Sequence, residues 1–414
     1  MRRVLMIAFH FPPLAGSSGI QRTLRFAQHL PEHGWEPLVL TATPSAYEST
    51  SPDLLADVPQ GLVVERALAF DAARQLSLGG RYPGFLARPD RWISWRFDAV
   101  RRARALVRRY RPQVIWSTYP IATAHVIGAR VQAATGLPWV ADFRDPMAQD
   151  GYPADPRTWQ AFDAIERQVI ASAARSVFAA RGAAREYRRR YPTHAERIGV
   201  IENGYDESSF AAAERRGGLD QPLTPGALTL LHSGIVYPSE RDPTALMDAI
   251  QMLARTDGVA PTRLRFRFRA SAHDDLLRRL AAQRGIEAFI ELLPAVGYQE
   301  ALAEMLRADA LLVMQASNCN DQVPAKVYEY ARAGRPILAL TDAAGDTAAC
   351  LREFGVQRMA ALDDASAIAR LLHSFLEVPR GAALMPDRAM AGKASRAQRT
   401  GELAAVLDAA GARR

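Results

Sequence analysis

Short apolar segments and longer segments of helical periodicity alternate along this chain, and no other feature constrains its fold so tightly. Strand-like segments before residue 202 lie at 4–9, 37–41, 114–117, 139–143, 176–179 and 198–201. Helical periodicity fills much of the sequence between them, at 20–33, 97–110, 122–134, 159–173 and 183–190. Strands separated by helices predict a parallel sheet with helices on both of its faces.

The alternation starts again after a polar segment with glycine and proline, residues 206–226, which we interpret as a linker. Strand-like segments then lie at 228–232, 264–269, 289–293, 310–314 and 336–340, with helical ones between them. We therefore predict an α/β chain of two doubly wound domains, 1–205 and 206–389. A C-terminal helix is expected at about 390–412, and it could pack back onto the first domain or onto the second. Ligands of such folds bind at the carboxyl ends of the strands, so we expect the site in a cleft between the two domains.

Composition excludes several classes of protein. The chain has 414 residues, 49% of them hydrophobic, but no apolar run of about 18 residues, so we expect no transmembrane helix. The first apolar segment leads into Pro12-Pro13 and not into a small-residue cleavage site, which favours a strand over a signal peptide. The cysteines, Cys319 and Cys350, form neither a disulfide framework nor a cysteine zinc site, and they fit a reducing, cytoplasmic compartment.

Positive charge is carried almost entirely by arginine. Lysine and arginine together number 52 against 44 acidic residues, yet only Lys326 and Lys393 are lysines. The excess lies mostly in residues 1–207, where Arg96–Arg111 and Arg175–Arg197 hold seven arginines each. These segments form either solvated helix faces or a basic surface for an anionic membrane or a lipid-linked acceptor. No nucleic-acid motif accompanies them, so we expect no nucleic-acid partner.

A loop of small residues joins the first strand to the first helix, and Gly16, Ser17, Ser18 and Gly19 end it. A strand, a small-residue loop and a helix N-terminus together present backbone N–H groups to an anion or a sugar hydroxyl. A plain tight turn explains the same residues. The spacing is that of neither a dinucleotide fingerprint nor a P-loop, so neither NAD binding nor ATP hydrolysis is indicated.

Charged residues also cluster where an apolar strand ends, in Asp142-Phe143-Arg144-Asp145-Pro146. Three charged groups at a strand terminus suit a binding site better than a core, although Arg144 could instead pair with its neighbouring acids to hold the loop. His125 lies on the preceding helix, where a lone histidine serves either packing or chemistry.

The most informative cluster runs from Asp321 through Lys326 to Glu329, ahead of and within a predicted helix. A helix N-terminus with a lysine favours phosphate, and the Glu329 carboxylate could hold ribose or sugar hydroxyls. Ser233 and Gly234 end the first strand of the second domain. Arg241 follows them at a position where a cation could meet a diphosphate.

Together these motifs resemble the family-4 retaining glycosyltransferases of the GT-B fold, over roughly residues 3–345. The elements that match, in the family's order, are Phe11-Pro12-Pro13 with Arg22, Asp142–Pro146, Asn203-Gly204-Tyr205-Asp206 with Phe210, and Pro324 to Ile337. The resemblance implies two Rossmann-like domains facing each other, with the acceptor bound by the N-terminal and the nucleotide-sugar by the C-terminal one. Two positions depart from the family: Asp321 replaces the usual glutamate, and Ile235 and Val236 follow Gly234 where a basic residue is usual.

The motifs and the resemblance together assign roles to individual residues; the resemblance implies that Glu329 contacts the donor ribose and that Arg241 and Lys326 face the diphosphate. The donor-binding set is Gly16, Ser17, Ser18, Gly19, Ser233, Gly234, Arg241, Lys326, Val327, Tyr328 and Glu329. The catalytic set is Arg241, Lys326, Asp321 and His125, and the acceptor side holds Arg22, Asp142, Arg144 and Asp145. Because the usual basic residue after Gly234 is missing, Arg241 could share the diphosphate with Lys326 or Arg269.

We therefore expect an enzyme that transfers a sugar from a nucleotide diphosphate sugar to a glycan or lipid-linked acceptor with retention of anomeric configuration. The cations would stabilise the leaving diphosphate. We expect no cofactor and no metal requirement, because no ligand cluster stands out in the sequence. Bacterial members of the family commonly build surface polysaccharide or glycolipid, so we expect a cytoplasmic protein at the inner face of the membrane. The alternatives are a nucleotide-sugar epimerase of the same fold and a noncatalytic nucleotide-sugar-binding relative.

Overall fold

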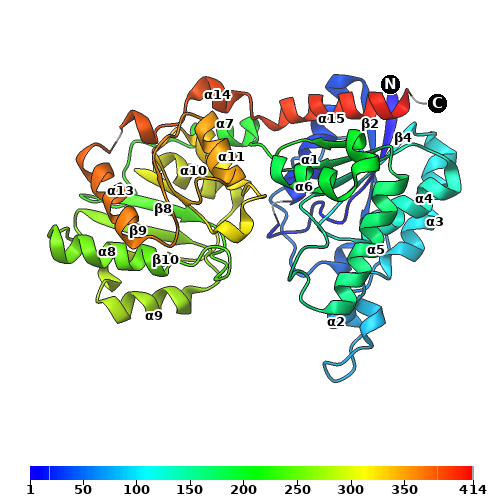
Figure 1. Ribbon diagram of the computed structural model, residues 1–414. Coiled ribbons are helices and arrows are strands. Elements are labelled where there is room, and N and C mark those ends of the chain that lie inside the picture. The colour runs from blue at the N-terminus through cyan, green and yellow to red at the C-terminus, as the bar shows by residue number, and fades with distance from the viewer. Residues whose placement is uncertain (18, 380, 413–414) are drawn as a thin grey trace. The chain divides into compact units, whose positions relative to one another are not determined.

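The computed structural model describes residues 1–17, 19–379 and 381–412. The chain folds into two compact units: unit 1 comprises residues 1–202 and the C-terminal segment from Arg396, and unit 2 comprises Asn203–Ser395. Each unit contains one parallel sheet with helices on both faces (Figure 1). The predicted fold class, two doubly wound α/β units, is confirmed.

The sheet of unit 1 has seven strands in the order β3-β2-β1-β4-β5-β6-β7. They are β1 (Arg2–Ile7), β2 (Trp35–Ala42), β3 (Val63–Ala67), β4 (Val114–Thr118), β5 (Trp139–Arg144), β6 (Arg175–Phe178) and β7 (Ile198–Val200). The central strands are apolar runs because helices cover both of their faces. The strand order reverses direction between β1 and β4, which makes the carboxyl ends of these two strands the switch point.

The helices of unit 1 follow the strands as the periodicity predicts, except for one short helix at 72–75 that the periodicity does not indicate. They are α1 (Gly19–His29), α2 (Ala72–Gln75), α3 (Trp95–Tyr110), α4 (Thr123–Thr135), α5 (Pro156–Ser172), α6 (Arg181–Arg190) and α15 (Arg396–Gly411), with 3₁₀ turns η1 (Leu30–His33), η2 (Pro44–Ala46), η3 (Gly84–Ala87) and η4 (Pro192–Arg197). The C-terminal α15 lies beside α1 (Figure 1), where Leu403 and Leu407 join the apolar core around Leu24. The Trp35 indole donates a hydrogen bond of 2.8 Å to the Asp408 carboxylate and anchors the helix.

The sheet of unit 2 has six strands in the order β10-β9-β8-β11-β12-β13. They are β8 (Leu228–Ser233), β9 (Leu264–Arg269), β10 (Ile290–Leu293), β11 (Ala310–Gln315), β12 (Ile337–Thr341) and β13 (Met359–Ala360). Alternate residues of β11 serve opposite faces: Leu312 and Met314 belong to one apolar core, and Leu311 and Val313 to the other. Here the order reverses between β8 and β11.

Helices cover both faces of this sheet as well. They are α7 (Glu207–Arg215), α8 (Thr244–Thr256), α9 (Asp274–Arg284), α10 (Tyr298–Arg307), α11 (Lys326–Ala333), α12 (Asp346–Glu353), α13 (Ala365–Glu377) and α14 (Arg388–Gly392), with 3₁₀ turns η5 (Glu287–Phe289), η6 (Ser317–Cys319) and η7 (Ala382–Leu384). The interpretation of residues 206–226 as a linker was wrong at its start, because α7 occupies Glu207–Arg215. The Asp206 carboxylate caps this helix by accepting a 2.8 Å hydrogen bond from the Ser209 N–H. Phe210, on the same helix, is fully buried.

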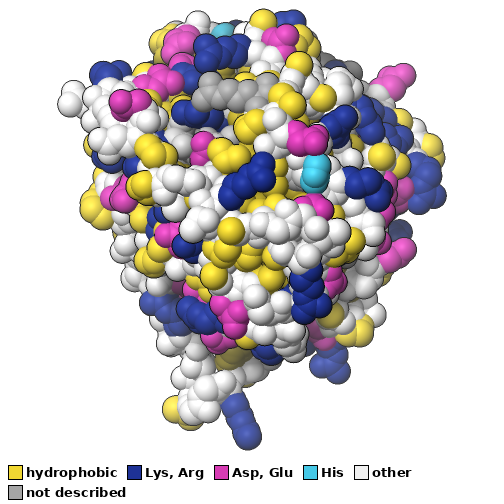
Figure 2. Space-filling view, turned by 90° about the vertical axis from the view of Figure 1, so that its left-hand side faces the viewer, with side chains coloured by type: hydrophobic (Ala, Val, Ile, Leu, Met, Phe, Trp, Pro, Cys, Tyr) yellow, Lys and Arg dark blue, Asp and Glu magenta, His cyan; other side chains and the backbone are white. Residues whose placement is uncertain are grey.

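Charges of both signs are mixed on the molecular surface. On the face drawn in Figure 2, arginine and lysine side chains stand among acidic and apolar ones, and no large area of a single sign is visible. The high arginine content therefore gives this face no basic patch.

Candidate functional site

Both switch points carry residues that the sequence singles out, so each unit is described in turn. In unit 1 the loop after β1 leads into α1, and β5 ends at Arg144, with Asp145 directly after it. In unit 2 the loop after β8 carries Gly234 and Arg241, and the loop after β11 carries Asp321 and leads into α11 at Lys326.

In the loop ahead of α1, the side chains of His10 and Arg144 come very close to the backbone of Gly19. The Ser17 hydroxyl lies 2.9 Å from the His10 Nδ1 and accepts a hydrogen bond of 3.2 Å from the Gly19 N–H. A Cβ at Gly19 would stand 2.5 Å from the His10 Nδ1 and 2.6 Å from the Arg144 Nη1. Gly16 has a φ of 79°, which favours glycine. The predicted Ser18 lies outside the described residues.

Arg144 and His10 bring two basic groups to this loop. Burial, and then the Arg144 guanidinium, lower the pKa of His10 to about 3, so its ring is neutral at pH 7. Arg144 is itself buried, has a φ of 61°, and donates a weak hydrogen bond of 3.4 Å to the Tyr119 carbonyl. Its Nε has no hydrogen-bond partner among the described residues. Burial raises the pKa of the neighbouring Asp145, and the Arg144 charge opposes that shift.

Arg22 and Asp142, predicted to face the acceptor, form a buried pair. Their exposed fractions are 2% and 0%, and the Asp142 carboxylate accepts two hydrogen bonds from the Arg22 guanidinium at 2.8 and 3.0 Å. Arg22 also donates to the carbonyls of Ile201 and Glu202. Because each charge is satisfied internally, this geometry favours a structural role over contact with an acceptor.

His125, predicted as a catalytic residue, lies in the core of unit 1. Its Nδ1 is 2.8 Å from the Ser117 hydroxyl, which also accepts a hydrogen bond from the Trp139 indole. The ring packs against Trp139 and Phe143. Burial lowers its pKa to about 4. The structure therefore supports the packing alternative for this histidine.

Lys326 is the centre of the arrangement in unit 2. Its Nζ lies 3.1 Å from the His232 Nε2, and the His232 Nδ1 lies 2.9 Å from the Leu312 carbonyl. A carbonyl only accepts, so Nδ1 carries the proton and Nε2 offers a lone pair to the Lys326 ammonium. Burial lowers the pKa of Lys326 well below its usual value, as does the nearby Arg241 charge, while Glu329 opposes the shift.

Arg241 supplies a second positive charge beside Lys326. It donates a 3.0 Å hydrogen bond to the Ile235 carbonyl and stacks over Tyr237, while its buried Nε has no partner in the described chain. Neither Arg241 nor Lys326 forms an ion pair with an acidic side chain in the described chain. Two neighbouring cations without such a pair repel each other, and a bound anion would relieve that repulsion.

The backbone of the loop after β8 lies close to Lys326, one of these two cations. Gly234 has a φ of 112°, and a Cβ there would lie 3.2 Å from the Lys326 Nζ. The Tyr330 hydroxyl accepts a hydrogen bond of 2.9 Å from the Ser233 N–H and ties β8 to α11. The structure thus brings Ser233, Gly234, Arg241 and Lys326 together, as predicted.

The remaining predicted residues on α11 differ in what they offer a ligand. Glu329 is partly buried and accepts a hydrogen bond of 2.8 Å from the Tyr298 hydroxyl, which orients its carboxylate. Val327 and Tyr328 are fully buried in the apolar core, so their side chains pack and do not contact a ligand. Asp321 is exposed in the turn between η6 and α11.

Arg269, considered for the diphosphate, has other partners. Its guanidinium donates to the Glu304 carboxylate at 2.7 and 2.9 Å and to the Pro294 carbonyl at 2.8 Å. Glu304 also accepts from Arg267. These contacts join β9 to α10, so the structure does not offer Arg269 to a phosphate.

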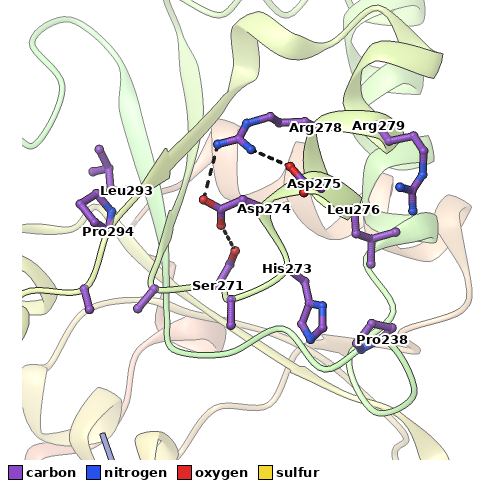
Figure 3. Close-up of a pocket in the computed structure, with 13 residues that line it drawn as sticks. Pro238, Ser271, His273, Asp274, Asp275, Leu276, Arg278, Arg279, Leu293 and Pro294 are labelled. Atoms are coloured by element: carbon purple, nitrogen blue, oxygen red, sulfur yellow. Dashed lines mark hydrogen bonds and ion pairs between the residues drawn. The ribbon is translucent and has the colours of Figure 1, made fainter. Parts of the chain in front are cut away.

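Sequence reasoning missed a cavity of about 800 Å³ at the carboxyl ends of β9 and β10 (Figure 3). Ser271, His273, Leu293 and Pro294 are among the residues that line it. Asp274 accepts a hydrogen bond from Ser271 and pairs with Arg278 across its rim, as the dashed lines in Figure 3 show. Ala270 and Ala272, also in the lining, have φ values of 55° and 60°, which alanine rarely adopts; no sequence pattern signals this.

The described part of the chain has neither a metal-binding cluster nor a membrane-spanning helix. No group of three or more histidine, cysteine, aspartate or glutamate side chains there could hold a metal ion. None of the described helices is both long and apolar enough to span a bilayer.

The sequence of residues 18–204 resembles a known protein family, and the fold of almost the whole chain resembles solved structures. Residues 18–204 match the family model for a glycosyl transferase 4-like domain. No curated protein sequence matches the chain. HepE from Anabaena, crystallised in complex with UDP and glucose, is 14% identical with a TM-score of 0.65, over 99% of each chain. Sucrose-phosphate synthase from Thermosynechococcus elongatus is 15% identical with a TM-score of 0.69, over 99% of this chain and 100% of its own. A glycosyltransferase from Rickettsia africae is 11% identical with a TM-score of 0.68, over 98% of each chain.

Proposed function

This chain carries a glycosyltransferase domain of the family-4 type within a GT-B fold, and from that premise we propose that it transfers a sugar from a nucleotide diphosphate sugar to an acceptor with retention of anomeric configuration. The observation that carries the donor assignment is the pair Lys326 and Arg241. Two cations beside one another at a sheet switch point, neither of them ion-paired, are suited to a diphosphate. HepE was crystallised with UDP and with UDP-glucose, which supports a nucleotide-sugar as the donor.

In this proposal unit 2 binds the donor. Lys326 and Arg241 contact the diphosphate, and Gly234 lets the loop after β8 come close to it. Glu329, oriented by Tyr298, accepts hydrogen bonds from ribose or sugar hydroxyls. The cavity beyond β9 and β10 is large enough for the nucleoside, since ligand pockets commonly span about 300–1,000 Å³.

Catalysis rests on charge that develops on the leaving diphosphate. As the anomeric C–O bond breaks, negative charge grows on the β-phosphate oxygen, and the fixed cations stabilise that state more than the ground state. The acceptor hydroxyl attacks from the face that the diphosphate leaves, and the leaving phosphate takes its proton. We propose that the two cations take the place of a divalent metal ion, so that no metal or other cofactor is required. Asp321, exposed next to α11, then contacts the donor sugar.

Unit 1 takes the acceptor in this proposal. Gly16, Ser17 and Gly19, which we also assign to the donor phosphates, and the partly buried Asp145 offer the acceptor polar contacts, and Arg144 supplies positive charge. We propose a glycan or lipid-linked acceptor and a role in bacterial surface polysaccharide or glycolipid synthesis, at the inner face of the cell membrane. The arginine excess of residues 1–207 supports an anionic partner for this unit.

A thermal-shift screen of nucleotide diphosphate sugars tests the donor assignment. A shift with one donor, lost in Lys326→Ala, supports the proposal, and no shift with any nucleotide contradicts it. Product analysis with that donor alone then separates the reactions: an epimerase converts donor without acceptor, whereas a transferase needs one. Binding without turnover in the presence of any acceptor indicates a noncatalytic relative.

A further inference from the structure

Apolar side chains are exposed on a segment of unit 1 that follows α2, residues 76–88, which we call the projecting loop. Leu78 has an exposed fraction of 90% and Phe85 one of 69%. In Figure 1 this loop, drawn in light blue, extends beyond α2 and away from the rest of its unit. Large apolar side chains at such exposure cost free energy in water, so a partner that covers them is expected.

The charge of the same segment indicates the chemistry of that partner. Residues 72–89 contain Arg74, Arg81 and Arg88 but no aspartate or glutamate. Arg88 lies 3.8 Å from Asp155, whereas Arg81 is exposed and forms no ion pair in the described residues. Apolar side chains flanked by arginines match the interface of an anionic bilayer, where the rings and chains enter the headgroup region and the guanidinium groups meet lipid phosphates.

The two arginine-rich segments that the sequence suggested for this purpose are less suited to it. On α3, Arg101 and Arg102 pair with Asp98, and Arg102 also pairs with Glu65. On α6, Glu186 neutralises much of the charge in the same way by pairing with Arg189 and Arg190.

We propose that the projecting loop docks unit 1 on an anionic membrane surface by inserting Leu78 and Phe85 among the lipid headgroups, with Arg81 beside them. This proposal rests on the membrane location given under the proposed function and names the surface responsible. The loop lies in unit 1, and the residues that we assign to the donor all lie in unit 2 except those at Gly16–Gly19. Membrane binding and donor binding can therefore fail separately.

Vesicle flotation tests the proposal. The protein is mixed with vesicles of phosphatidylcholine alone or with about a third phosphatidylglycerol, at low and high salt. We expect the full chain to float with the anionic vesicles only, and to be released in part by high salt. Leu78→Ser with Phe85→Ser should weaken that partitioning about tenfold or more, and Arg81→Ala about fivefold. The control Val378→Ser, at a residue of unit 2 exposed to 58%, should leave it unchanged.

A fluorescent reporter locates the insertion directly. Cys319 and Cys350 are buried, so a Phe85→Cys variant offers an exposed thiol for an environment-sensitive dye. We expect a blue shift with anionic vesicles and none with neutral ones. The proposal is overturned if the full chain does not bind anionic vesicles, if the double variant binds as the full chain does, or if the double variant dissociates an oligomer that the full chain forms without lipid. Calorimetric binding of the donor by the double variant checks the proposed function independently.

Discussion

Replacing Lys326 by methionine tests two effects of its charge separately. One is the loss of folding stability from burying the charge, and the other is the contribution of the charge to activity. The structure places its ammonium against the His232 Nε2 and near Arg241, where burial and the arginine lower its pKa. A lowered pKa means that the unfolded chain binds the proton more tightly. The folded state therefore gains stability as pH rises from that lowered pKa toward the ordinary value of 10.5. Methionine has a similar shape and no charge, so we expect Lys326→Met to be as stable as the native chain or more stable at pH 7, with a flatter stability profile above it.

In the proposed mechanism Lys326 directs its charge at the diphosphate, and the expected loss in activity follows from that charge. Two unit charges at 4 Å interact by about 4 kcal/mol at an effective dielectric constant of 20. That energy corresponds to about a thousandfold in rate if it acts entirely in the transition state. Part of it also binds the ground-state donor, so we expect kcat to fall about a hundredfold and the donor Kd to rise about tenfold.

Initial rates with saturating donor, together with calorimetric donor titration, measure both effects. The chain supplies a matched control, because Lys393 is exposed at the end of α14 and Lys393→Met should change neither. A Lys326→Met protein with native kcat and Kd would refute the assignment. A variant that loses activity only in proportion to its loss of folded protein would refute it as well.

Further substitutions test the roles of residues in unit 1. Asp142→Ala leaves the buried Arg22 charge without its partner, so urea unfolding should show a free energy of unfolding lower by about 3–5 kcal/mol. Native stability together with a raised acceptor KM would instead support the predicted contact with the acceptor. Gly19→Ala should displace Arg144 and cost about 1–3 kcal/mol, measured in the same way, and an unchanged crystal structure at Arg144 would contradict this. His125 is buried with a pKa of about 4, so the native state should lose up to about 3 kcal/mol as pH falls from 6.5 to 4, since only the unfolded chain takes up the proton. His125→Leu should flatten that dependence, and an equal slope would show that His125 is not its source.

Sequence patterns predicted the elements that lie deepest in each unit. Buried parallel strands such as β1 and β11 are continuous apolar runs, and their positions follow directly from the sequence. The edge strand β3 was missed because it is only partly buried and carries Glu65 and Arg66. The start of α7 was missed because most of its residues are polar or alanine, and its three buried positions, Ser209, Phe210 and Ala213, include one large apolar side chain.

The residues that we propose to bind the donor were singled out from the sequence for a different reason. Gly234 and Arg241 lie in the loop after β8, and Lys326 begins α11 just after the loop that follows β11. These segments flank the reversal of strand order, and the order of strands and helices already indicates them. The contacts among them could not be predicted, since His232 meets Lys326 across 94 residues of sequence. For the same reason the charges at Asp142 were visible in the sequence, but not their burial against Arg22, 120 residues away.

The most direct test of the central claim is the anomeric configuration of the product. Once the screen has identified an α-linked nucleotide diphosphate sugar, its reaction with acceptor can be followed by proton NMR at the anomeric position. We predict release of one nucleoside diphosphate for each α-linked product formed, with no product from Lys326→Met on the same time scale. A β-linked product, or a new nucleotide-sugar formed without release of nucleoside diphosphate, would contradict retaining transfer by this site.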